Sequence, residues 1–332
     1  MELAEIYRVE ALRRQAEIEG RTELSDQYGQ ELHKKTCHLP YMVFPNSFAM
    51  VDVFQTDISQ GLIEDISRIH PDETHQEIDQ VKDFCRAYVE GLLDVDLSKV
   101  DIVRVGGNFK HAEGKALPCG AVDHIVLLPP KGEDYMSPDL LVHELGHTAE
   151  FTLRRAGEDI EMLRSHRLFS EAIAHFCQYR YMLEFGTRTH RLHALASVTK
   201  DHMLLRALYA HYNLPDPPNT FEVNRIIDHK YLDGYRTAYT RDKIEWLLAD
   251  YEGRPFVELY FLVAEPRMGA VLALHLIDNA AAIRMLCQIK TDASVRDMLN
   301  CLNLNTDELM DFTQADALFR QFVEGRIHTA NA

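Results

Sequence analysis

The spacing of apolar and polar positions predicts a mainly helical chain. Residues 1–35 are helix-forming and strongly charged, and apolar positions in residues 56–93 recur with helical spacing. A proline-punctuated apolar stretch, residues 38–54, predicts a loop followed by the start of a strand or helix. We therefore expect residues 1–100 to form an N-terminal, mainly helical lobe.

Two β-rich runs between glycines and prolines predict the strands of a small sheet. They are "VDIVRVGGNF" (residues 100–109) and "GAVDHIVLLPP" (residues 120–130). We expect a strand along residues 122–129 to have one unpaired edge, which could hold an extended peptide by β-augmentation. The sheet should come immediately before the next helix.

From Ser137 onward nearly the whole chain shows helical periodicity. Breaks are expected where glycine or proline interrupts it, at Gly157, Gly186, residues 213–220, Gly253 and Pro266. The predicted fold is therefore mainly α with a small β-sheet, in a chain long enough for one large domain or for two lobes that share a cleft.

Composition and charge narrow the possible partners. The chain has 332 residues, of which 46% are hydrophobic and 26% charged, as in a soluble globular protein. Its formal net charge of −17 disfavours nucleic acid and anionic membranes as partners and favours cationic substrates. The sequence gives no prediction of the oligomeric state.

The first residues and the cysteines predict the compartment. The start of the chain lacks the apolar core of a signal peptide, and no apolar run approaches the ~20 residues of a membrane span. The six cysteines are scattered without C-x-x-C spacing, as expected of reduced thiols. We expect a cytoplasmic protein, with export by a route that needs no cleaved signal peptide as the alternative.

The stretch "LVHELGHTAEF" (residues 141–151) contains two histidines suited to binding a metal. Ser137 is placed as an N-cap and Pro138 as the first helical residue, so a helix should begin there. On that helix His143 and His147 are four positions apart, about 40° around the axis, and both imidazoles project from one face. His-Glu-x-x-His on a helix is a zinc-binding pattern.

Two other residues of the motif have expected roles. Glu144 follows His143 by about 100° around the helix, which suits a carboxylate that acts as general base rather than as a ligand. Gly146 within a helix costs about 1 kcal/mol relative to alanine. We expect another backbone or a substrate to pass close to this glycine.

A catalytic zinc site needs a third protein ligand. The segment "HRLFSEAIAHFCQYRYMLEF" (residues 166–185) predicts a second helix, in which Glu171 is the leading candidate. Its neighbours Ser170, Ala172 and Ala174 are small, so this helix could pack tightly on the glycine face of the first. The rival candidates are His166, His175, His190 and His193.

Three blocks, "GKALPCGAVDHIVLLPP" (residues 114–130), "DLLVHELGHTAEF" (139–151) and "LFSEAIAHF" (168–176), resemble the gluzincin metallopeptidases. Within them the chain is similar to the thimet oligopeptidase and oligoendopeptidase F family. The resemblance covers roughly residues 110–290 and implies a two-lobed metallopeptidase in which residues 101–332 form the catalytic region. The resemblance implies that Glu144 is the general base and that the zinc ligands are His143, His147 and Glu171.

A weaker fourth block, "HKYLDGYRTAYTRD" (residues 229–242), is similar to the family's His followed by Gly-Tyr-x-x-x-Tyr. Carried over by position, His229, Tyr235 and Tyr239 would face the substrate, with Tyr260 as a competing tyrosine. The alternative for the first two tyrosines is an aromatic pair in a helix core. The family usually has a third histidine where Glu150 stands here, and this chain is much shorter than typical members.

The function that these residues imply is zinc-dependent hydrolysis of peptide bonds in a peptide or protein substrate. Glu144 would take a proton from water and deliver it to the leaving amine. A tyrosine hydroxyl could stabilise the charge that develops on the carbonyl oxygen. The alternatives are a secreted effector or toxin protease that acts on one specific folded protein, and an inactive pseudo-peptidase that only binds.

Overall fold

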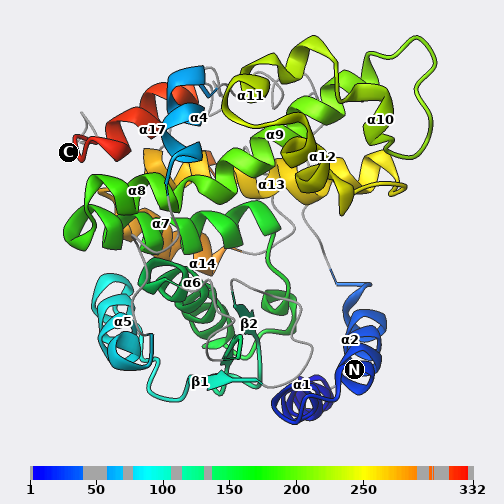
Figure 1. Ribbon diagram of the computed structural model, residues 1–332. Coiled ribbons are helices and arrows are strands. Elements are labelled where there is room, and N and C mark those ends of the chain that lie inside the picture. Colours follow the sequence, from blue (N-terminus) through cyan, green and yellow to red (C-terminus); the bar gives the residue numbers. More distant parts are fainter. Residues whose placement is uncertain are drawn as a thin grey trace.

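The computed structural model describes residues 3–39, 58–69, 78–105, 114–130, 137–289, 299–300, 302 and 314–327 (Figure 1). Within these ranges the protein is mainly helical with a single small sheet, as the sequence predicts. Of the predicted loop and following element at residues 38–54, all but the first two residues lie outside the described residues.

The sheet has three strands in the order β1-β3-β2. Strand β3 (Ile125–Leu128) is central, with β1 (Asp101–Arg104) parallel on one side and β2 (Lys115–Leu117) antiparallel on the other. The expected free edge along residues 122–129 is therefore wrong, because both edges of that strand are paired. Strand β2, which the sequence analysis missed, is an edge strand of only three residues, too short to show an alternating pattern.

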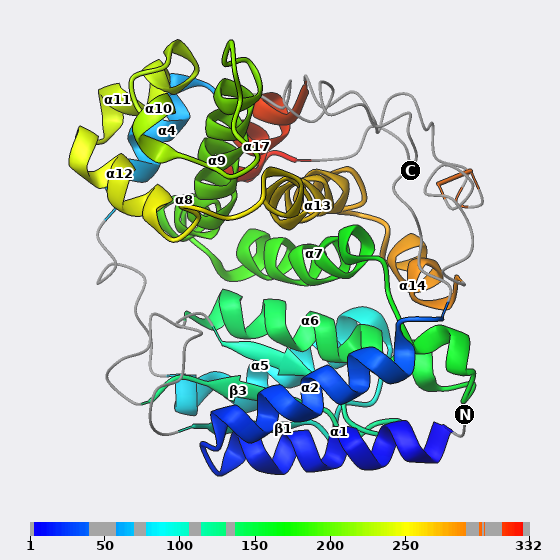
Figure 2. The same cartoon turned by 90° about the vertical axis from the view of Figure 1, so that its right-hand side faces the viewer.

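Three helices stacked on one another form the centre of the molecule (Figure 2). Helix α7 (Arg167–Phe185) lies between α6 (Pro138–Arg155) and α13 (Phe256–His275). Leu141 and Leu145 of α6 are fully buried in this core. Because apolar side chains fill both faces of α7, its position relative to α6 is well defined, and the candidate site lies between these two helices.

Glycines allow these helices to approach closely. A Cβ on Gly146 would lie 2.8 Å from Ala174 Cα of α7, which confirms the expected backbone contact. A Cβ on Gly269 of α13 would lie 2.7 Å from the Leu168 carbonyl oxygen and 2.8 Å from Glu171 Cβ. Any side chain at either position would therefore push α7 away.

The helix breaks expected at Gly157, Gly186, residues 213–220 and Gly253 all lie between helices. The break expected at Pro266 is wrong, because α13 continues through it. Proline removes one backbone hydrogen bond. Burial of α13 against α7 and α9 (Ala196–Tyr212) overrides that loss.

Helices from residues 1–100 pack in different places (Figures 1 and 2). The pair α1 (Leu3–Ile18) and α2 (Thr22–Thr36) lies beside the sheet, and α5 (Ile78–Leu93) packs on α6. In contrast, α4 (Gln60–Ser67) packs against helices from the second half of the chain, including α11 (Asp233–Ala238). A single lobe bounded at residue 100 stays a prediction.

The connection between α4 and the C-terminal part is specific. The Ser59 N–H donates to Asp316 Oδ1 at 2.8 Å, and Arg188 pairs with Asp65 at 2.8 Å. Leu62 and Ile66 of α4 are buried.

The remaining helical elements are α8 (Arg188–Ala194), α10 (Val223–Ile226), α12 (Arg241–Ala249), α14 (Ala280–Gln288), α17 (Ala315–Val323) and the 3-10 turns η2 (Ile160–Leu163) and η3 (Lys230–Leu232).

Candidate metal centre

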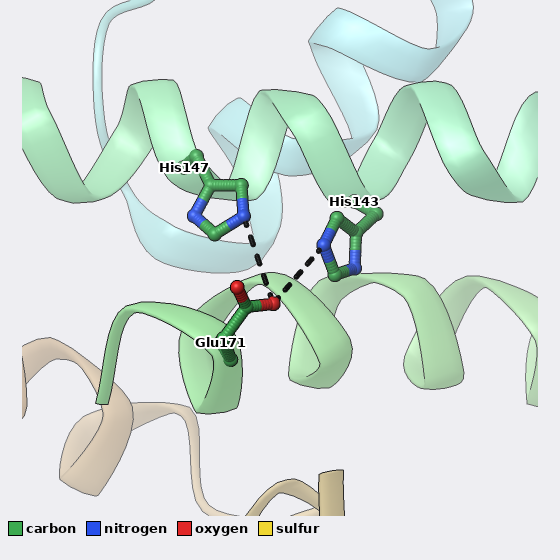
Figure 3. Close-up of side chains that lie close together, drawn as sticks. All are labelled: His143, His147 and Glu171. Carbon is green, nitrogen blue, oxygen red and sulfur yellow. Dashed lines mark ion pairs between the residues drawn. The ribbon is translucent and has the colours of Figure 1, made fainter. Parts of the chain in front are cut away.

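His143, His147 and Glu171 come together between α6 and α7 (Figure 3). Glu171 Oε2 lies 3.6 Å from His143 Nε2 and 4.0 Å from His147 Nε2, and the three ligand atoms lie within 4.8 Å of one another. Helix α6 begins as predicted, with Ser137 at the N-cap position and Pro138 in the first turn. Because both histidines lie within this helix and are four positions apart, they share one helix face.

His147 is oriented by a chain of two polar side chains. Its Nδ1 lies 3.0 Å from Ser170 Oγ, and the Ser170 hydroxyl donates to Glu150 Oε2 at 2.5 Å. Because the serine proton is given to the carboxylate, its oxygen is left to accept from His147 Nδ1–H. This directs the lone pair of His147 Nε2 towards Glu171.

His143 is oriented by a separate chain. Its Nδ1 lies 3.3 Å from Gln178 Oε1, and Gln178 Nε2 donates to Asp139 Oδ2 at 2.8 Å. The Ser137 hydroxyl donates to the other carboxylate oxygen of Asp139. The N-cap serine thus binds the side chain that supports the site, rather than a backbone N–H of α6.

The charges in the cluster favour a cation. Burial lowers the pKa of His147 to about 4, so this imidazole is neutral at pH 7. Burial alone would raise the pKa of Glu171, but its contact with His143 and the neighbouring imidazoles hold that pKa well below the ordinary value. Burial lowers the pKa of His143, and Glu171 outweighs this and raises it overall. Glu171 is therefore ionised, and a positive charge beside it is stabilised.

Glu144 lies at the boundary between α6 and the sheet. Its Oε2 accepts a hydrogen bond from the Ala116 N–H of β2 at 2.6 Å. This bond fixes the carboxylate beside the ligands but outside their set, as the sequence analysis expected.

A cavity of about 370 Å³ opens onto the cluster. Its floor includes both histidines, Glu144 and Glu171, and Arg167 lines it one turn before Glu171. Arg167 Nε lies 3.6 Å from Glu171 Oε1. The other lining residues come from α9, from the turn after α12 and from α13; they are Ser197, Lys200, Asp201, Tyr251, Leu262, Val263 and Pro266.

The rival third ligands do not join the cluster. His166 is the N-cap of α7, and its Nδ1 accepts from the Leu168 N–H at 3.2 Å. His190 caps α8 through Thr187, and His193 follows it in that helix. His175 lines the cavity, with its ring centroid 4.7 Å from that of His143, but lies outside the set of ligand atoms.

The predicted tyrosines line a different, adjoining cavity that shares Ser197 and Lys200 with the first. Tyr235 is buried, and its hydroxyl contacts His202 Nδ1 at 2.5 Å and donates to the Thr199 carbonyl at 3.1 Å. Tyr239 stacks on Tyr235 with ring centroids 6.4 Å apart. Neither lines the cavity of the metal ligands.

His229 and Tyr260 also lie away from that cavity. His229 caps η3, where its ring accepts from the Tyr231 N–H at 3.3 Å. Tyr260 is buried within α13. The tyrosine that the structure brings to the cavity is Tyr251, which the sequence analysis missed. It follows α12 in a turn, where helical periodicity gives no signal.

The supporting residues Asp139, Ser170, Gln178 and His175 had a partial signal in the sequence. His175 and Gln178 follow Glu171 by four and seven positions, so all three share one face of α7. Asp139 precedes His143 by four positions in the same way. Their hydrogen bonds depend on how α6 meets α7, which spacing along one helix does not give.

The donor set fits zinc. Two imidazole nitrogens and one carboxylate oxygen, each fixed by its neighbours, are the protein ligands of hydrolytic zinc sites. The outer hydrogen bonds of both histidines provide the orientation that such ligands need. A cavity on the same side leaves room for substrate.

Comparison with known proteins returned no match among family models, curated proteins or solved structures. In the part of the chain that the structure describes, no helix is long and apolar enough to cross a membrane. The family resemblance of the motifs therefore stays a prediction.

Proposed function

We propose that the protein is a zinc-dependent metallopeptidase that hydrolyses peptide bonds in peptides or in a protein substrate. The observation that carries this proposal is the joint placement of His143, His147 and Glu171 with Glu144 on the floor of one cavity. The proposal includes a gluzincin-like, two-lobed arrangement around this cavity. The net charge of −17 favours cationic peptides.

His143, His147 and Glu171 would hold the zinc. When bound, zinc supplies Lewis acidity, which makes water a nucleophile near neutral pH and polarises the scissile carbonyl. Glu144 takes a proton from the attacking water and later delivers it to the leaving amine. The Ala116 N–H holds the Glu144 carboxylate in place for both transfers.

A group that stabilises negative charge on the carbonyl oxygen is also needed. Tyr251 and Lys200 line the same cavity as the ligands, and the Lys200 ammonium lies 6.0 Å from the centre of the Tyr251 ring. Both can donate a hydrogen bond to an oxyanion. We therefore place Tyr251 before Tyr239 and Tyr235 as the candidate for this role.

The decisive experiment compares the zinc-loaded wild type with Glu144→Gln on a mixed peptide library, with new termini identified by mass spectrometry. The glutamine keeps the size of the side chain and can still accept from Ala116, so folding and zinc content should be unchanged. Peptide hydrolysis should fall by several orders of magnitude because the proton carrier is lost.

Metal content supplies the control. One zinc per chain should co-purify with the wild type and be lost in His147→Ala and in Glu171→Ala, but not in His33→Ala, which alters an exposed histidine of α2. Near-normal hydrolysis by zinc-loaded Glu144→Gln would exclude the mechanism. No hydrolysis by zinc-loaded wild type would favour the binding-protein alternative.

A further inference from the structure

The orientation of the buried Gln178 amide determines which ring nitrogen carries a proton in His143 and in His175. Asp139 is a carboxylate and can only accept, so Gln178 must direct its NH₂ group to it, at 2.8 Å. The other end of the Gln178 amide, Oε1, then lies 3.3 Å from His143 Nδ1 and 3.1 Å from His175 Nδ1. An amide oxygen only accepts, so both imidazoles donate from Nδ1.

A neutral imidazole that is protonated on Nδ1 has its lone pair on Nε2. In His143 that atom faces Glu171 and the metal position. The Nε2 atom of His175 makes no hydrogen bond with a described residue. It is also not fully buried, unlike the polar side-chain atoms that are enclosed without a partner. Because the His175 ring lines the cavity, its Nε2 is open to that cavity.

We infer that His175 Nε2 is a substrate-binding group that accepts a hydrogen bond from a backbone N–H of the peptide in the cavity. The inference rests on the proposed function and adds a contact to it. A fourth metal ligand is the less suitable role, because His175 lies outside the group of ligand atoms within 4.8 Å of one another. Every peptide brings backbone N–H donors, and an unmatched acceptor in a cavity selects for them.

The first test reads the tautomer directly. Long-range ¹H–¹⁵N spectra of protein labelled with ¹⁵N-histidine should show His175 protonated on Nδ1 and bare on Nε2, with its signals assigned by their loss in His175→Asn. In Gln178→Leu the Nδ1 partner is removed, and the Nε2–H form should appear. A wild-type His175 protonated on Nε2 would overturn the inference.

The second test uses two matched variants. His175→Asn retains an N–H near the Nδ1 position for Gln178 but has no atom at Nε2, whereas His175→Gln reaches the cavity with an oxygen that can accept. We expect His175→Asn to lower kcat/KM for peptides about tenfold with zinc content unchanged, and His175→Gln to recover part of the loss. Loss of zinc in His175→Asn would make this residue a metal ligand and overturn the inference.

The third test identifies the donor. A series of peptides in which each non-scissile amide in turn is replaced by an ester removes one N–H at a time. At one position the ester should slow the wild type about tenfold and leave His175→Asn unaffected. Equal slowing of both proteins at every position would show that His175 binds no substrate N–H.

The two proposals fail in different ways. If the zinc-loaded wild type cleaves no peptide, the proposed function falls, and with it the substrate assigned to His175. If the enzyme cleaves peptides but His175 is protonated on Nε2, or if no ester position distinguishes His175→Asn, only this inference falls.

Discussion

Ser170 and Glu150 lie outside the candidate ligand set but orient one of its members, His147. The resembled family usually has a histidine at the position of Glu150, and here the carboxylate accepts the Ser170 proton instead. Burial raises the pKa of Glu150, whose Oε2 bond to Ser170 is 2.5 Å long. The serine oxygen is thereby fixed as an acceptor for His147.

We expect Ser170→Ala to weaken zinc binding at least tenfold, because His147 loses the partner that orients its ring. Ser170→Thr keeps the hydroxyl and should restore most of the affinity. Competition with a chelating dye measures the zinc Kd, and Ser98→Ala, at an exposed turn, is the control. An unchanged zinc Kd in Ser170→Ala would show that this hydrogen bond has no role in metal binding.

Replacing Tyr251 and replacing Tyr235 should affect different quantities, catalytic rate in the first case and stability in the second. Tyr251→Phe should lower kcat about 10²-fold with little change in KM, because the hydroxyl acts mainly in the transition state. Tyr235→Phe should leave kcat unchanged and lower stability by about 1 kcal/mol, because its hydroxyl is bonded to His202 and Thr199. Tyr239→Phe is the third member of the series.

Steady-state kinetics on a cleaved peptide and thermal unfolding decide between these roles. A normal kcat in Tyr251→Phe together with a large fall in Tyr239→Phe would return the role to the residue that the family resemblance indicates. Retained kcat in all three variants would exclude a tyrosine as the stabilising group.

At the level of single residues, the cluster of His143, His147 and Glu171 was accessible from the sequence. Spacing of four places His143 and His147 on one face whatever packs against it. The other lining residues, such as Lys200 and Tyr251, come from helices and turns distant in the sequence. Their approach to the site depends on tertiary packing, which periodicity does not report.

Helix α13 positions the part of α7 that carries Glu171. Gly269 meets the backbone of α7 at Leu168 and the Cβ of Glu171 itself. We expect Gly269→Ala to lower the free energy of unfolding by about 1–3 kcal/mol and to weaken zinc binding, because α7 must shift to admit a methyl group.

The matched control is Gly91→Ala in α5, where an added Cβ meets nothing within 4 Å. This variant should gain about 0.5–1 kcal/mol from helix propensity and keep its zinc affinity. Denaturant unfolding and zinc titration of both variants test the contrast. A Gly269→Ala protein that is as stable as Gly91→Ala, with unchanged zinc affinity, would contradict the close contact.

Burial of Glu265 in α13 is expected to make the stability of the fold depend on pH. Burial raises its pKa to about 7, partly offset by Arg167. Because the folded pKa is above that of the unfolded chain, the unfolded state loses its proton first. The stability linked to the protonated carboxyl is complete below about pH 4.5 and is lost as the pH rises through about 7.

We expect Glu265→Gln to be more stable than the wild type at pH 8, and this advantage to shrink by about 3 kcal/mol on going to pH 4. Urea unfolding of both proteins across this pH range measures the difference in their free energies of unfolding. The contributions of the other titrating groups cancel in that difference. A difference that does not change with pH would show that Glu265 ionises normally in the folded protein.

Helical periodicity predicted the elements better than it predicted their ends and partners. It placed the start of α6 at Ser137, and it placed a break at Pro266 where α13 continues. Propensity describes an isolated segment, whereas burial on two sides adds enough free energy to retain a helix that lacks one hydrogen bond. Strand β2 had too few residues to be recognised.

At the scale of the whole molecule, the contact between α4 and α17 joins distant parts of the chain. Ser59 and Asp316 are 257 residues apart, yet they share a hydrogen bond. Leu62, Ile63 and Ile66 of α4 are buried in the finished fold. Their burial depends on elements that the ribosome makes much later, chiefly α11.

This separation has a consequence for synthesis. At about 5–20 residues per second, the 257 residues take roughly 13–50 s to translate, and for that period the start of α4 lacks its contact with Asp316. Protease added to ribosome-bound chains stalled before residue 233, which lack α11, should cut within residues 58–69, while the released full chain resists there. Resistance of the stalled chains would show that earlier elements alone protect α4. If α4 is cut, this segment offers a chaperone an exposed apolar surface on the nascent protein.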